Sequence, residues 1–110
     1  MRRPHSYLPQ TVDAVRVLGL QIAQARRERH MTAHEICERS QISAVTLRNV
    51  ERGSLTVAIG IYFEVAILVG IDLYEVEPNA LPALVARGQD RLNLLPSRVR
   101  ESKGRVPDDF

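Results

Sequence analysis

The chain has 110 residues, of which 45% are hydrophobic and 25% charged, with two Phe, no Trp and one cysteine, Cys37. This length supports one small core, the few aromatic residues favour helices packed on helices over a β-sandwich, and a single cysteine excludes an intramolecular disulfide framework. Residues 1–60 hold nine Arg against five acidic residues, while residues 61–110 hold six basic against eight acidic residues. This asymmetry indicates that the first half of the chain binds a polyanion, although ordinary scatter of surface charge explains it equally well.

The expected fold is all-α, with five or six helices between two loose ends. Residues 1–10 contain two prolines and are expected to form a flexible arm, in which Arg2 and Arg3 can touch phosphate. Residues 11–77 are expected to form the main domain and residues 78–95 a helical extension. Residues 96–110 lack the apolar surface needed to offset the entropy of ordering, and we expect a mobile tail there.

The first helix is expected from Val12 to about Arg29, with Thr11 as its cap. Apolar residues recur there at spacings of three or four and define one buried face. They are Val15, Leu18, Ile22 and Ala25.

Two short helices joined by a tight turn are expected between Thr32 and Gly53. Thr32 and Glu35 have the spacing of a capping box, in which each side chain satisfies a free backbone donor of the other residue. Ser43 is placed to cap the second helix, and Gly53 suits the left-handed conformation that ends one.

A fourth helix is expected from about Ala58 to Val69, ending at Gly70. It is apolar almost all round, with Glu64 as its only charge, so it needs cover on more than one side. In a chain this small, the second cover can be another subunit, and we expect a dimer interface there. Its expected residues are Tyr62, Phe63, Ala66 and Ile67.

Two further helices are expected after this one. Asp72 can cap a short helix, LYEVE, that Pro78 ends, and Pro82 can occupy the first turn of another. The possible buried contacts of the latter are Leu84, Val85, Leu92 and Leu95.

The second helix of the pair has the polar outer face that reading DNA in the major groove requires. If Leu47 and Val50 face the core, Asn49 can pair with adenine and Arg48 with guanine or phosphate. Arg27 and Arg29 are candidate phosphate contacts. The full set of expected DNA-binding residues is Ser43, Ala44, Val45, Thr46, Arg48, Asn49, Arg52, Arg27 and Thr32. A helical hairpin with no DNA role is the competing interpretation.

The stretch from Leu18 to Ile71 resembles the XRE (Cro/CI-type) family of helix-turn-helix DNA-binding domains. The matching features are an Arg before the motif, the Thr at the helix start, the apolar spacing of the second helix and the final VGI. The resemblance implies a lambda-repressor-like fold and a structural ion pair between Arg26 and Glu51. Gln41 departs from the pattern, because the turn commonly has Gly there.

The phrases TLRNVERG, VAIGIYFEVAILVGI and LLPSRVR also look like a subgroup of HipB-type antitoxins. That resemblance implies a homodimeric repressor of its own operon, bound to palindromic double-stranded DNA, with a HipA-like toxin kinase as partner. A stand-alone repressor and a helical interaction module that does not bind DNA are the alternatives. A cytoplasmic, nucleoid-associated location is expected.

We expect no catalytic site, no cofactor and no metal. His34 and Cys37 lie three residues apart, but a zinc site needs more ligands in a tetrahedral arrangement. No nucleophile elbow, phosphate loop or HExxH motif occurs. The apolar run from Val57 to Ile71 is too short to span a bilayer, so no membrane association is expected.

Overall fold

The computed structural model describes residues 5–101, and within them it contains helices and no strand. The expectation of an all-α fold is therefore confirmed. In chain order the elements are α1 (Pro9–Glu28), α2 (Ala33–Ser40), α3 (Ala44–Glu51), α4 (Ile59–Leu68), the 3₁₀ turns η1 (Leu73–Glu75) and η2 (Pro78–Ala80), and α5 (Leu81–Asn93).

The first helix begins earlier than the sequence pattern predicted. Its N-cap is Leu8, which makes no capping hydrogen bond, and Pro9 opens the helix. Proline suits that position because its fixed φ is already helical and its missing N–H would have no partner there. The prediction that Thr11 caps the helix is wrong, and the predicted arm is shorter than residues 1–10. Arg2 and Arg3 lie outside the described residues.

Helices α1 to α4 all end in the same way, with one residue in the left-handed conformation. The next N–H then donates to the carbonyl five residues earlier, which satisfies an acceptor that the helix end leaves free. The four left-handed residues are His30 (φ 56°), Gln41 (φ 58°), Gly53 (φ 74°) and Gly70 (φ 88°). The four bonds run from Met31 to Arg26, Ile42 to Cys37, Ser54 to Asn49 and Ile71 to Ala66, at 2.9–3.1 Å.

The predicted helix LYEVE is only a single 3₁₀ turn. Tyr74 and Glu75 both have positive φ, at 57° and 60°, which a continuing right-handed helix cannot contain. Asp72 precedes the turn without capping it through its side chain.

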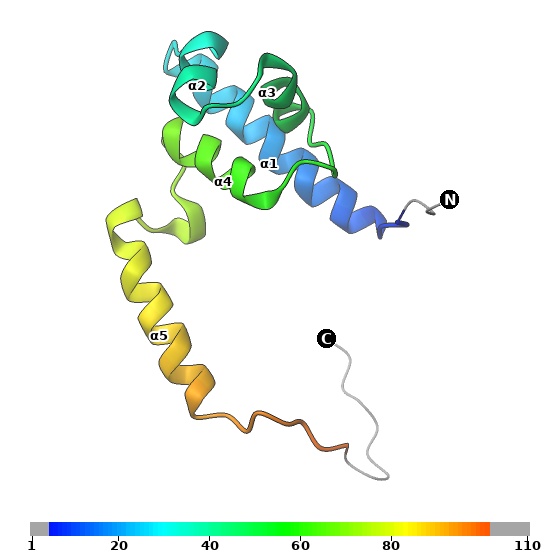
Figure 1. Cartoon of the computed structure of the whole chain (residues 1–110), viewed down its shortest axis with the longest axis vertical. Helices are drawn as coiled ribbons and strands as arrows, with labels where there is room; N and C mark the ends of the chain where they lie inside the picture. Colours follow the sequence, from blue (N-terminus) through cyan, green and yellow to red (C-terminus); the bar gives the residue numbers. More distant parts are fainter. Residues whose placement is uncertain (1–4, 102–110) are drawn as a thin grey trace. The chain divides into compact units, whose positions relative to one another are not determined.

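The core of the first unit lies where α1, α2, α3 and α4 meet (Figure 1). Helix α4 supplies three of the eight buried apolar residues and its C-cap Val69 a fourth, because α1 and α2 of the same chain both pack against it. The core residues are Ile22, Ile36, Leu47, Val50, Tyr62, Val65, Ala66 and Val69.

This packing corrects the predicted dimer interface. Tyr62 is 3% exposed and Ala66 is fully buried within the chain, so neither can meet a second subunit. Phe63 is half-buried, with its ring edge-on to Tyr74 at a centroid distance of 6.2 Å. Ile67 is exposed. The cover that α4 requires comes from this chain's own α1 and α2, and the prediction had assigned part of it to another subunit.

Two polar contacts join α4 to the rest of its unit. The Tyr62 hydroxyl donates to the Ser54 carbonyl at 2.6 Å, and burial raises the pKa of Tyr62. The Arg29 guanidinium donates to the Val69 carbonyl at the end of α4. Arg29 is therefore engaged inside the fold, which weakens its candidacy as a phosphate contact.

The chain divides into two compact units between Pro78 and Asn79. In the second unit, α5 does not bury the contacts predicted for it: Leu84 is half-buried, while Val85, Leu92 and Leu95 are 71%, 62% and 63% exposed. An amphipathic helix alone offers no second surface to cover its apolar face. Among the described residues, no helix combines the length and apolar character needed to cross a membrane.

Candidate nucleic-acid interface

The central feature of the site is the pair α2 and α3, joined by the three residues Gln41, Ile42 and Ser43. Thr32 and Glu35 form a complete capping box at the start of α2. The backbone N–H of Glu35 donates to the Thr32 hydroxyl at 3.1 Å, and the backbone N–H of Thr32 donates to the Glu35 carboxylate at 3.0 Å. These bonds favour the ionised carboxylate and hold the pKa of Glu35 below its usual value,.

Thr32 was among the expected DNA contacts, and the structure gives its hydroxyl a different partner. It lies 3.0 Å from the same Glu35 carboxylate oxygen and donates to it. Thr32 is exposed at the start of α2, but its donor is already used in the cap.

The turn reaches α3 through Gln41 in the left-handed conformation, with φ 58° and ψ 43°. A residue with a Cβ is strained there, which is why glycine is the usual choice. Ser43 then caps α3, because its hydroxyl accepts from the Thr46 N–H at 3.0 Å. The Ser43 hydroxyl also donates to the Thr46 hydroxyl at 3.0 Å.

Helix α3 has one buried and one exposed face. Leu47 and Val50 are 2% and 0% exposed and belong to the core. The opposite face carries the expected DNA-reading side chains. Ala44, Val45, Arg48 and Arg52 are exposed, while Thr46 and Asn49, three positions apart, are half-buried. Asn49 is thus only partly open to a ligand, less than the sequence pattern alone suggested.

An ion pair between Arg26 and Glu51 joins the end of α1 to the end of α3. The guanidinium meets the carboxylate in fork geometry, with Nε at 2.7 Å from Oε2 and Nη2 at 3.2 Å from Oε1. Its Nη1 donates to the Met31 carbonyl at 3.0 Å, which also ties down the loop before α2. The hydrogen bond to Glu51 raises the pKa of Arg26. Both side chains are mostly buried, at 13% and 15% exposure, so their role here is structural.

Helix α3 is also positioned by a close backbone contact with α1, which the sequence pattern did not reveal. A Cβ added to Gly19 of α1 would lie 2.5 Å from the Val50 carbonyl oxygen and 2.8 Å from the Gly53 nitrogen. A Cβ added to Gly53 would lie 2.6 Å from the Cα of Arg16. Both sites therefore require glycine for lack of space. In the sequence, the only signal is a glycine in the middle of a helical pattern, where glycine is normally unfavourable.

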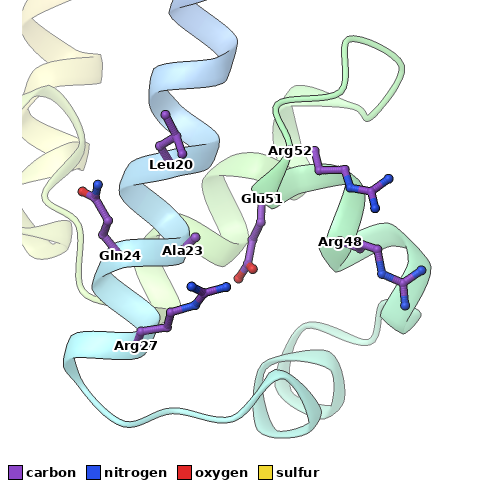
Figure 2. A pocket seen from close by; sticks show the side chains of 7 residues that line it. All are labelled: Leu20, Ala23, Gln24, Arg27, Arg48, Glu51 and Arg52. Atoms are coloured by element: carbon purple, nitrogen blue, oxygen red, sulfur yellow. The ribbon is translucent and has the colours of Figure 1, made fainter.

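A hollow of about 450 Å³ lies between α1 and α3. Figure 2 shows Arg48 and Arg52 extending from α3, with Arg27 of α1 pointing toward Glu51. The side chains that line it are Leu20, Ala23, Gln24, Arg27, Arg48, Glu51 and Arg52. Because Glu51 is paired with Arg26, three arginines give this surface an excess of positive charge. Such a surface attracts a polyanion.

The C-terminal part of the first unit has the opposite charge. From Val57 to Pro78 the sequence contains four acidic residues and no Lys or Arg, the acids being Glu64, Asp72, Glu75 and Glu77. All four are exposed. An uneven charge distribution of this kind orients a protein as it approaches a polyanion, with its basic elements leading.

The residues considered as metal ligands, His34 and Cys37, have other neighbours in the structure. His34 pairs with Glu38 at 2.8 Å on the exposed side of α2, and Cys37 is half-buried against the core. Within residues 5–101, no three His, Cys, Asp or Glu side chains gather as a metal site would require.

Comparison with protein-family models, with curated proteins and with solved structures finds no match to this chain.

Proposed function

We propose that this chain is a sequence-specific DNA-binding repressor with a lambda-repressor-like fold, and that it binds a palindromic operator as a homodimer. One observation carries the proposal: the capped helix α3 buries Leu47 and Val50 and leaves Val45, Arg48 and Arg52 exposed. The major groove of B-DNA is wide enough for an α-helix and displays a different edge pattern for each base pair. The resemblance of residues 18–71 to the XRE family agrees with this function.

Each residue of the face has a distinct role in the proposal. Arg48 donates to guanine and Asn49 pairs with adenine, while the apolar Ala44 and Val45 contact thymine methyl groups. Arg52 and Arg27, at the edges of the hollow, contact phosphate. Ser43 presents the free N–H groups at the start of α3 to the backbone of the DNA.

The homodimer follows from the small size of the reading helix. One α3 contacts only a few base pairs, whereas two copies about 34 Å apart read both halves of a palindrome on one side of the duplex. The protein then acts by occupying its operator, as a binder and not as an enzyme.

Selection of bound fragments from random DNA, followed by sequencing, tests the proposal. We expect a palindrome whose half-sites are separated by about one helical turn. Asn49→Ala should change the preferred base at one position per half-site, at a cost of about 1–3 kcal/mol there. If no sequence is enriched and the protein does not bind DNA at low salt, the DNA-binding proposal is wrong. The remaining interpretation is then a helical interaction module.

The salt dependence of binding separates phosphate contacts from base contacts. Arg27→Ala should weaken all sequences alike and reduce the slope of log K against log salt by about 1 for each phosphate that the protein no longer neutralises. Arg98→Ala is the matched control, since it removes the same charge from the second unit. If Arg98→Ala reduced the slope equally, the effect of Arg27 would be one of net charge.

The antitoxin role is a second part of the proposal, supported by the resemblance to HipB-type antitoxins. The second unit of the chain, beyond Pro78, would then engage a HipA-like kinase. Co-purification of the full chain with proteins expressed from its own operon tests this role. Co-purification of a kinase at a fixed ratio would support this role. A chain that purifies without a partner would instead be a stand-alone repressor.

A further inference from the structure

The connection between α3 and α4 is held at one residue, Ser54, through all of its polar groups. The Ser54 N–H donates to the Asn49 carbonyl at 2.9 Å, and this bond closes the last turn of α3. The Ser54 carbonyl accepts from the Tyr62 hydroxyl at 2.6 Å. The Ser54 hydroxyl lies 2.9 Å from the Thr56 hydroxyl and accepts from the Thr56 N–H at 3.3 Å. Ser54 therefore links the end of α3 to the first turns of α4.

Tyr62 contributes to this link through its hydroxyl alone. Its ring belongs to the core and the residue is 3% exposed, so a phenylalanine ring would fill the same space. The hydroxyl needs a partner at that depth, because a buried hydroxyl without a hydrogen bond is unfavourable. The partner in this chain is the Ser54 carbonyl, which lies eight residues earlier and outside α4. The hydroxyl thus adds a contact to the loop that the apolar core does not require.

A second contact holds the same loop from the side of α1. Gly53 lies so close to α1 that an added Cβ would be 2.6 Å from the Cα of Arg16. The loop is therefore fixed at two successive residues, by the backbone of α1 at Gly53 and by the hydroxyl of α4 at Ser54. Arg52, the exposed C-cap of α3, comes directly before these two residues, so its backbone position depends on theirs.

We propose that Tyr62 is a positioning residue for DNA recognition, which acts by holding Ser54 and, through it, the last turn of α3. That turn carries Asn49 and leads into Arg52, to which the proposed function assigns an adenine and a phosphate. Side chains that read a ligand keep their position only when contacts behind them hold the backbone in place. Tyr62 is buried and acts without touching DNA. This inference rests on the proposed function and adds a residue behind the reading face.

Specific and non-specific binding depend differently on such positioning. Non-specific binding comes from the attraction between positive charge and phosphates, which tolerates small displacements of a side chain. Base reading instead needs hydrogen bonds of fixed geometry between a side chain and a base edge. A loosened end of α3 should therefore lower the affinity for the operator and leave the affinity for unrelated DNA almost unchanged. A loss of folded protein would lower both affinities by the same factor.

Tyr62→Phe in the full chain tests this role, with Tyr74→Phe as the matched control. Both substitutions remove one phenolic hydroxyl, but Tyr74 is 70% exposed. The probes are the operator obtained by selection from random DNA and a duplex of the same length with a scrambled sequence. Tyr62→Phe should weaken operator binding by about three- to tenfold, the effect of losing one hydrogen bond. It should change binding to the scrambled duplex by less than about twofold, and Tyr74→Phe should change neither affinity.

Backbone order parameters measured by NMR without DNA follow the loop directly. In Tyr62→Phe those of Arg52 and Ser54 should fall from about 0.85, typical of rigid backbone, toward about 0.6, typical of flexible segments. The order parameter of Leu47, in the middle of α3, should not change. Parent values at Arg52 and Ser54, or an equal fall at Leu47, would contradict the proposal even if operator binding were weaker.

The binding measurements also separate this inference from the proposed function. A parent chain that selects no sequence refutes the proposed function, and this inference with it. If the parent selects an operator and Tyr62→Phe keeps the parent's ratio of operator affinity to scrambled affinity, this inference alone is refuted. A lower ratio, together with lower order parameters at Arg52 and Ser54, supports both.

Discussion

Replacing Arg26 by alanine should destabilise the first unit without changing which DNA sequence it prefers. The substitution leaves the carboxylate of Glu51, 15% exposed, without its fork-shaped partner, and it frees the Met31 carbonyl. Removing one member of a buried ion pair costs about 3–5 kcal/mol because the remaining charge stays desolvated. Some solvent reaches both groups, so we expect about 2–4 kcal/mol, which corresponds to a fall in Tm of roughly 10–20 °C for a domain of this size.

Thermal unfolding followed by circular dichroism measures this cost. The double variant Arg26→Ala with Glu51→Ala should be more stable than Arg26→Ala alone, since it removes the orphaned charge as well. Arg26→Lys is the conservative control, and it should recover only part of the loss because an ammonium group cannot make the two-pronged contact.

DNA selection with Arg26→Ala at low temperature, where the variant is folded, gives the opposing test. If its Tm equals that of the parent while its preferred sequence changes, Arg26 reads DNA and the assignment of inner and outer faces is inverted.

Three further predictions concern the ends and contacts of the helices. Gly19→Ala should cost about 1–3 kcal/mol despite the better helix propensity of alanine, because its Cβ would overlap the backbone of α3,; Gly60→Ala, which meets no described atom within 4 Å, should be neutral or stabilising in the same urea titration. Gln41→Gly should raise stability by about 0.5–1 kcal/mol because it relieves a left-handed residue, and a lower urea midpoint would contradict this reasoning,. The lowered pKa of Glu35 means that its carboxylate stabilises the fold above the ordinary glutamate pKa and that this contribution is lost as the pH falls through the folded value,. The stability advantage of the parent over Glu35→Gln should therefore be constant above about pH 5 and shrink below pH 4, and an advantage independent of pH would refute this assignment.

The features of this structure that depend on neighbouring residues could be predicted from the sequence alone. The capping residues Thr32 and Ser43 act within a few positions of themselves, so their patterns could be read directly. The alternation of buried and exposed residues along α3 follows from the helical period of 3.6 residues, with Leu47 and Val50 inside,. The pairing of Arg26 with Glu51, 25 positions apart, came only from resemblance, because no local rule connects such residues.

Tertiary structure decided what covers each apolar surface. Helix α4 looked incomplete in sequence, and periodicity cannot say whether its cover comes from the same chain or from another. The structure buries Tyr62 and Ala66 beneath α1 and α2 and leaves Val85 and Leu92 of α5 exposed. The role of Gly19 was likewise invisible, since a close approach of two backbones depends on elements about 30 residues apart in the chain,. The sequence thus determined where α2 and α3 begin and which face of α3 is polar, and the packing decided which surfaces remain free to bind.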